Sequence, residues 1–204
     1  MNALDHYGSL MWTIRGRFEV IETLKKSNAD SFSRAESAAF HGRKIIEAIA
    51  FACLVAIDNG VKKIPRDAKG QWNAETIFKK LKNKNIEILP SPSLIRQPST
   101  EEISLNINIK FTIEGIPNRR LSYDNLIQIY QRLHFWLHEI NPYIYKDRMD
   151  LYNKKSDLLW EDLGKLNLFV ESHFVAISGA GFFCVLKDTK DGATKVIPLS
   201  KTKS

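Results

Sequence analysis

Cysteine is scarce in this 204-residue chain, which contains only two. Cys53 and Cys184 lie far apart inside apolar stretches, and neither has spaced partners that would suggest a zinc site or a disulfide framework. We therefore expect both thiols to be small core residues in a reducing cytosol. Internal repeats and low-complexity tracts are also absent from the sequence.

Long hydrophobic runs are missing as well. The longest, 48–57, is much shorter than the ~20 residues that span a membrane, and Glu47 and Asp58 bracket it. It predicts a buried helix rather than a membrane anchor. The N-terminus carries Asp5 and His6 where a secretory signal has basic residues followed by an unbroken apolar core. We therefore expect a cytoplasmic protein with no membrane partner.

The composition is that of a globular protein with an excess of basic residues. Hydrophobic residues make up 44% of the chain, which excludes a fully disordered protein and suffices for one substantial core. The 30 Lys and Arg residues outnumber the 23 Asp and Glu residues, giving a net charge of +7. This balance favours polyanionic partners such as nucleic acid, although a lysine-rich solvated surface produces the same balance.

Hydrophobic periodicity predicts several helices. Ser33 and Glu36 have the spacing of a capping box, which places the start of one helix there and its end at Asn59 and Gly60. From Ile45 onward this helix is apolar on nearly every side, which is typical of the central helix of a bundle. The other predicted helices cover 10–26, 73–83, 122–141 and 145–169.

Two regions predict β structure. Alternating apolar and polar residues over 103–115 predict a strand with one buried face, after an extended, proline-containing loop over 89–99. Three short strands are expected at 173–178, 182–187 and 194–199, with Asp191 and Gly192 as a hairpin turn. We therefore expect a mainly α fold: a helical domain over 1–170 with a strand or hairpin inserted near 86–115, and a C-terminal antiparallel β segment over 171–204 packed on it.

The segment QRLHFWLHEINP, 131–142, combines an arginine and two histidines at the end of a predicted helix. Ser122 is expected to cap this helix, and Pro142 to end it. The guanidinium of Arg132 can bind a phosphate through two parallel hydrogen bonds, and the imidazole of His138 can move a proton near neutral pH. An arginine and a histidine are the minimum set of side chains for metal-independent RNA cleavage. The same residues could also be ordinary surface residues of a helix.

Two blocks, RAESAAFHGRKIIEAIAFACLVA (34–56) and YQRLHFWLHEINPY (130–143), resemble the HEPN superfamily. These helical-bundle domains include many ribonuclease toxins and antiviral effectors. The resemblance implies an HEPN-like bundle and a catalytic Arg and His separated by four to six residues, a spacing that Arg132 and His138 match. It further implies metal-independent RNA cleavage that leaves a cyclic phosphate, in a homodimer whose two motifs line one cleft. An antitoxin or defence protein is a further partner that the resemblance suggests.

One position departs from the family pattern. Family nucleases usually carry a polar residue directly after the arginine, whereas this chain has Leu133 there and His134 one position later. A non-catalytic module that binds nucleotide, RNA or a partner protein is therefore the alternative to an endoribonuclease.

Other candidate residues are secondary. His134 and His138 have the i, i+4 spacing of a zinc pair but no third ligand, so we expect neither a metal nor another cofactor. Arg34 and His41 form a second Arg and His pair about two helical turns apart, although Ser33 and Glu36 also explain that segment as a helix start. A basic stretch with interleaved aromatic residues predicts either an RNA-binding surface or a solvated face; its candidate RNA contacts are Lys62, Lys63, Arg66, Lys79, Lys80 and Lys82.

Overall fold

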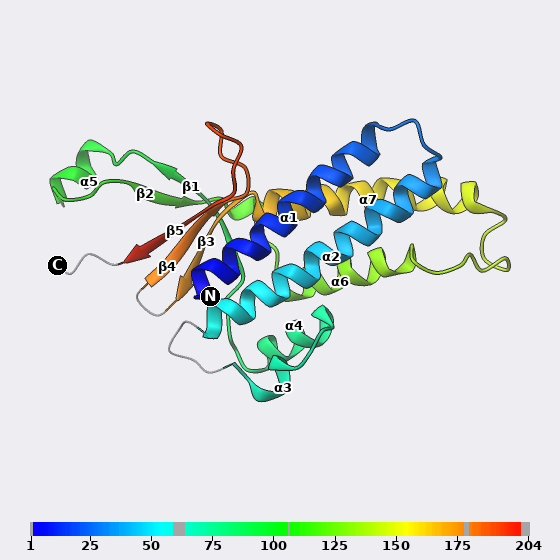
Figure 1. Ribbon diagram of the computed structural model, residues 1–204, viewed down its shortest axis with the longest axis horizontal. Helices are drawn as coiled ribbons and strands as arrows, with labels where there is room; N and C mark the ends of the chain where they lie inside the picture. Colours follow the sequence, from blue (N-terminus) through cyan, green and yellow to red (C-terminus); the bar gives the residue numbers. More distant parts are fainter. Residues whose placement is uncertain (1, 59–63, 106, 178–179, 201–204) are drawn as a thin grey trace.

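Four long helices form a bundle, and a β-sheet lies at one end of it (Figure 1). The computed structural model describes residues 2–58, 64–105, 107–177 and 180–200. The central helix α2 contacts the other three long helices, which confirms the position predicted from its apolar sequence. The long helices are α1 (Ala3–Lys26), α2 (Ser31–Asp58), α6 (Tyr123–Phe135) and α7 (Arg148–Val170).

Shorter helical elements lie beside the bundle and in the connections. Helix α4 contacts α2 and α6 through a face that buries Ile77, Phe78 and Leu81. Its position matches the helix predicted over 73–83, and Asn73 caps it by accepting a hydrogen bond from the Thr76 backbone N–H. The short elements are α3 (Arg66–Lys69), α4 (Ala74–Asn83), α5 (Thr100–Leu105) and the 3-10 helix η1 (Pro117–Arg119).

The sheet joins two parts of the chain that are distant in sequence. Its five antiparallel strands have the order β2-β1-β3-β4-β5. Strand β1 pairs with β3 at Ser91 and Phe174, so the inserted hairpin and the C-terminal segment form one sheet. The predicted C-terminal strands and the turn at Gly192, whose φ is 68°, are confirmed. The strands are β1 (Ser91–Arg96), β2 (Thr112–Gly115), β3 (Ser172–Ile177), β4 (Ala180–Val185) and β5 (Lys195–Ser200).

The predicted hairpin near 86–115 is present, but its strands occupy other residues. The expected extended loop over 89–99 contains β1, and α5 occupies the start of the expected strand at 103–115. The reason is a capping box: Ser99 Oγ accepts from the Glu102 backbone N–H at 3.2 Å, and Glu102 accepts from that of Ser99 at 2.7 Å. Arg96 binds both Glu102 and Glu114, which fastens α5 to the hairpin.

Two helix starts also differ from the prediction. Helix α1 begins at Ala3 rather than Leu10, because Asn2 and Asp5 form a capping box there. Helix α2 begins at Ser31, because the carboxylate of Asp30 accepts hydrogen bonds from the backbone N–H and the hydroxyl of Ser33. The predicted capping box of Ser33 and Glu36 is therefore wrong, and Asp30 is the cap.

Gly42 marks a point of close packing between three helices of the bundle. A Cβ atom on Gly42 of α2 would lie 2.4 Å from Leu163 of α7 and 3.0 Å from Leu133 of α6, so the three helices meet there. Cys53 and Cys184 are free and buried, as expected.

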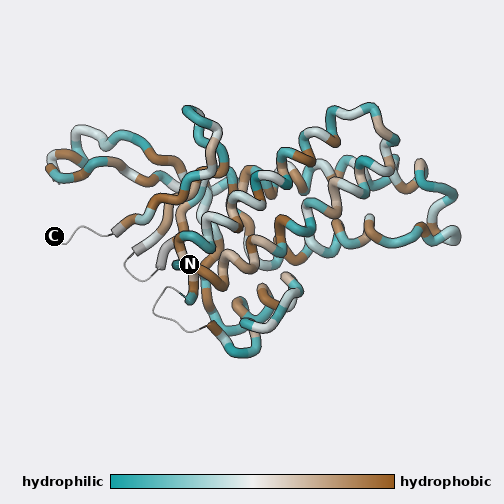
Figure 2. Tube along the Cα trace, viewed as in Figure 1, coloured by the Kyte–Doolittle hydropathy of each residue, from teal (hydrophilic) through white to brown (hydrophobic). Residues whose placement is uncertain are grey.

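Hydrophobic segments recur along the bundle helices and also at the tip of the β1–β2 hairpin, where Leu105 is 88% exposed (Figure 2). No helix within the described residues is long and apolar enough to cross a membrane.

Candidate functional site

Helix α6 carries Arg132 and ends sooner than predicted. Ser122 caps it as expected, by accepting from the Asn125 backbone N–H at 3.1 Å. The helix ends at Phe135, because the backbone N–H groups of Trp136 and Leu137 bond three residues back, to Leu133 and His134, and tighten the last turn. The prediction that this helix continues to Asn141 is therefore wrong, and His138 lies in the turn that follows the helix.

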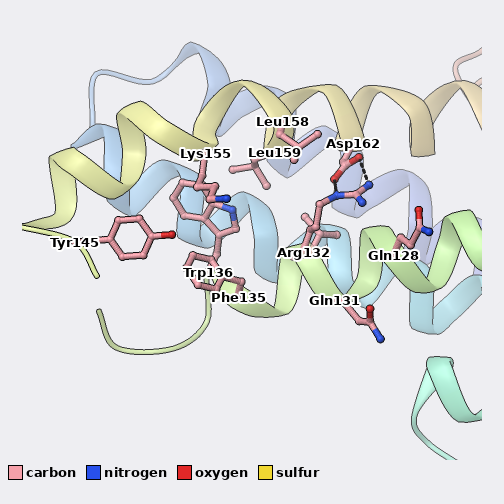
Figure 3. A pocket seen from close by; sticks show the side chains of 11 residues that line it. Gln128, Gln131, Arg132, Phe135, Trp136, Tyr145, Lys155, Leu158, Leu159 and Asp162 are labelled. Carbon is pink, nitrogen blue, oxygen red and sulfur yellow. Dashed lines mark hydrogen bonds and ion pairs between the residues drawn. The ribbon is translucent and has the colours of Figure 1, made fainter. Parts of the chain in front are cut away.

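Arg132 is held by a buried carboxylate on α7. Its Nε donates to Oδ2 of Asp162 at 2.7 Å and its Nη2 donates to Oδ1 at 2.8 Å, which is the two-pronged geometry of a strong ion pair (Figure 3). Asp162 is 0% exposed. The hydrogen bonds that Arg132 donates to Asp162 raise the pKa of Arg132 further, so the guanidinium stays charged. Within the described residues, Nη1 of Arg132 has no protein partner.

Arg132 lies where two cavities between α6 and α7 adjoin. They measure about 370 and 360 Å³, and both Gln128 and Arg132 line each of them. We call the two together the α6–α7 groove, with an aromatic end and a cationic end. The aromatic end is also lined by Gln131, Leu133, Phe135, Trp136, Tyr145, Lys155, Leu158, Leu159 and Asp162 (Figure 3), and the cationic end by Asn118, Arg119, Arg120, Leu121, Asn125, Ile129, Lys165 and Leu168.

Positive charge dominates the lining of the groove, where Asp162 is the one carboxylate among the lining residues of the described chain. Arg119 pairs with Glu171 at 2.8 Å and Lys165 pairs with Glu161 at 2.7 Å, so these two cations are partly neutralised. Arg120 and Lys155 have no carboxylate partner among the described residues, and both are exposed. The groove therefore presents two unpaired cations and one guanidinium that is fixed in place.

The two histidines of the motif lie away from this groove. His134 and His138 meet through their Nε2 atoms at 3.0 Å, with their rings edge to face. His134 follows Arg132 by two residues, which places it roughly 200° around the helix. Partial burial, then Arg43 of α2 and His138, lower the pKa of His134. No contact within the described chain joins Arg132 to His138.

The second pair, Arg34 and His41, has structural partners. Arg34 donates to the backbone carbonyls of Lys25 and Ser27, which fastens the turn between α1 and α2. His41 lies 3.4 Å from a guanidinium nitrogen of Arg17, and burial together with that charge lowers its pKa. Neither residue lines the α6–α7 groove.

The basic stretch is divided in the structure. Lys62 and Lys63 lie outside the described residues, and Arg66 begins α3. The three lysines of α4 pair with acids, an arrangement that leaves less charge for RNA: Lys79 with Glu75 at 2.6 Å, Lys80 with Asp67 at 3.4 Å, and Lys82 with Asp124 at 2.6 Å. Phe78 of the interleaved aromatic residues is fully buried, whereas Trp72 is exposed.

Sequence reasoning missed most of the groove. Asp162 had a detectable signal, because it falls on the apolar face of α7 with Leu159, Leu163 and Leu166, where a carboxylate needs a buried partner. Glu47 of α2 is a parallel case, because this buried carboxylate pairs with Arg43 and Lys44 and accepts a hydrogen bond from the hydroxyl of Tyr130. Arg119, Arg120, Lys155 and Lys165 had no such signal, since only folding brings them to α6.

Comparison with known proteins adds no relative. No protein-family model, curated protein or solved structure matches the chain. Within the described ranges, no three His, Cys, Asp or Glu side chains gather closely enough to hold a metal ion. The chemistry of the site therefore rests on the residues of the groove and on the exposed histidine pair.

Proposed function

We propose that this protein is an HEPN-like RNA-binding module that holds an RNA strand in the α6–α7 groove through Arg132. The observation that carries the proposal is the anchoring of Arg132 by a fully buried carboxylate, at the junction of two cavities whose other charged residues are cations. A phosphate is the ligand that a fixed guanidinium with a spare Nη group binds best. The net charge of +7 supports a polyanion as the partner.

Fluorescence anisotropy with a single-stranded RNA of about 12 nucleotides, a length typical of such sites, tests the proposal. Arg132→Gln is expected to weaken binding about 10- to 100-fold, because a hydrogen bond to a charged group is lost. The matched control is Arg15→Gln on α1, which removes the same charge from an exposed ion pair with Glu19 outside the groove. Equal affinities of the two variants would refute the role of the groove.

The test must separate binding from folding, because Arg132→Gln leaves Asp162 buried without its cation. The double variant Arg132→Gln with Asp162→Asn restores a neutral hydrogen-bonded pair, and it should bind RNA as poorly as the single variant. Arg120→Gln and Lys155→Gln remove cations that have no carboxylate partner among the described residues, so they should weaken binding without lowering stability. Binding of all these variants should fall steeply as salt rises.

A second candidate function is metal-independent RNA cleavage by Arg132 and His138, and the exposed histidine pair favours it. The Nε2 atoms of these two imidazoles lie 3.0 Å apart, and imidazole is the side chain that most often serves as a general acid or base. Since His138 lies beyond the end of α6 and contacts His134 rather than Arg132, cleavage would draw the histidine from a second copy of the chain. RNA incubated with EDTA and wild type should then acquire cyclic phosphate ends, and His138→Ala should abolish them. If His138→Ala cleaves as well as wild type, this candidate is removed.

A further inference from the structure

The two ends of the α6–α7 groove differ in chemistry, although both are lined by Arg132. The cationic end is formed by η1, α6 and α7, with Arg119, Arg120 and Lys165 and the amide side chains of Asn118 and Asn125. The aromatic end lies toward the loop after α6, with the rings of Phe135, Trp136 and Tyr145. A ligand that fills both ends has a flat apolar part on one side of Arg132 and negative charge on the other.

Phe135 provides an accessible ring surface at the aromatic end, and the buried ring of Tyr145 packs against it. Phe135, the last residue of α6, is 40% exposed and meets the Tyr145 ring edge to face at 5.9 Å. Trp136 is buried against Phe32 of α2, so it supports the wall of the cavity from behind. An exposed phenyl ring that is fixed by a second aromatic ring is a suitable platform for a stacked base.

Hydrogen-bonding groups without protein partners also line this end. The hydroxyl of Tyr145 points into the cavity toward Trp136 and Lys155 (Figure 3), and no described residue bonds to it. The indole N–H of Trp136 and the side-chain amide of Gln128 likewise have no partner within the described chain. Buried tyrosine and tryptophan side chains usually find one. These groups are therefore available to the polar edge of a ligand.

We infer that the aromatic end of the groove takes one unpaired nucleobase, stacked on Phe135 and bonded at its edge, while its phosphate lies on Arg132 and the strand continues over the cationic end. The inference rests on the proposed RNA-binding function and names its substrate class, single-stranded RNA. A cavity of about 370 Å³ is within the size range of small-ligand sites, so it accommodates a base but not a duplex. Bases inside a duplex are stacked and paired and do not reach the ring of Phe135.

The experiment compares four probes by anisotropy or competition: a single-stranded RNA, the same strand with all bases but one replaced by abasic sites, a duplex of equal length, and inorganic polyphosphate. Phe135→Ala should weaken binding of the single strand about ten-fold, the usual effect of losing one stacked base, and leave polyphosphate binding unchanged. Tyr145→Phe, which keeps the ring, should weaken the single strand less. The matched control is Phe40→Ala on α2, a phenylalanine of similar exposure, 44%, outside the groove.

The outcomes separate this inference from the proposed function. Tighter binding of the single strand than of the duplex, with an effect of Phe135→Ala on the single strand alone, supports it. Equal binding of duplex and single strand, or no effect of Phe135→Ala, overturns it, while an effect of Arg132→Gln still upholds RNA binding through the groove. If poly-glutamate displaces RNA as well as polyphosphate does, the groove is a general polyanion-binding site and the nucleobase inference fails.

Discussion

Two buried polar residues of this protein, Asp162 and His173, are satisfied in opposite ways. Both are 0% exposed. Asp162 binds a charged guanidinium that reaches a cavity, whereas His173 is neutral and sealed between the bundle and the sheet: its Nδ1 lies 2.9 Å from the Val170 carbonyl and its Nε2 lies 2.7 Å from the Tyr7 hydroxyl. Burial alone therefore does not mark a binding site; a buried group that fixes an accessible one does.

Removing the cation from the charged pair should have the largest effect on stability. Arg132→Ala leaves the Asp162 carboxylate buried without a partner, which costs about 3–5 kcal/mol of unfolding free energy. Asp162→Ala should cost less, because the side chain of Arg132 is 38% exposed and can return to water, whereas that of Asp162 is 1% exposed. Urea unfolding of the two variants measures the asymmetry. Equal costs would contradict the asymmetry and mean that water reaches the Asp162 carboxylate once Arg132 is removed.

The buried pair of His173 and Tyr7 should make the free energy of unfolding depend on pH. Burial lowers the pKa of His173 to about 4, below the ~6.5 of an exposed histidine. Between these values the unfolded chain binds more protons than the folded one, so the free energy of unfolding falls as pH drops from 7 to 4. The loss is about 3 kcal/mol at most, on the order of 1.4 kcal/mol for each pH unit. Urea unfolding at several pH values measures it.

The matched variant for this pH dependence replaces both partners, as Tyr7→Phe with His173→Leu, and should flatten the curve between pH 4 and 6.5. Any slope that remains belongs to His41 and His134, whose pKa values are also lowered but which are less buried, and, near pH 4, to carboxyl groups such as Glu102, whose bonds to Arg96 lower its pKa to about 2. An unchanged slope in the double variant would show that His173 is not the group responsible.

Hydrophobic patterns in the sequence predicted the helices and strands that neighbouring residues determine. The apolar run after Ile45 identified α2 as the central helix, and the short apolar segments from His173 onward, with a turn at Gly192, identified the C-terminal strands. The end of α6 was missed because tertiary burial of Trp136 accompanies a tightened last turn, which the distant Pro142 does not control. The site was predicted only in part: Arg132 was found by its neighbours in sequence, but Asp162 lies 30 residues away and becomes its partner through helix packing.

The smallest predicted effect contrasts two tyrosine hydroxyls. Tyr7→Phe leaves Nε2 of His173 without a donor and should cost about 1–3 kcal/mol, although the ring keeps its contact with Phe182 at 5.6 Å. Tyr145→Phe removes a hydroxyl that no described residue bonds, so it should change the unfolding free energy by less than about 0.5 kcal/mol. Thermal and urea unfolding of the two variants measure the contrast. A large loss of stability in Tyr145→Phe would show that its hydroxyl supports the fold, and the aromatic end of the groove would then have one fewer group to offer a ligand.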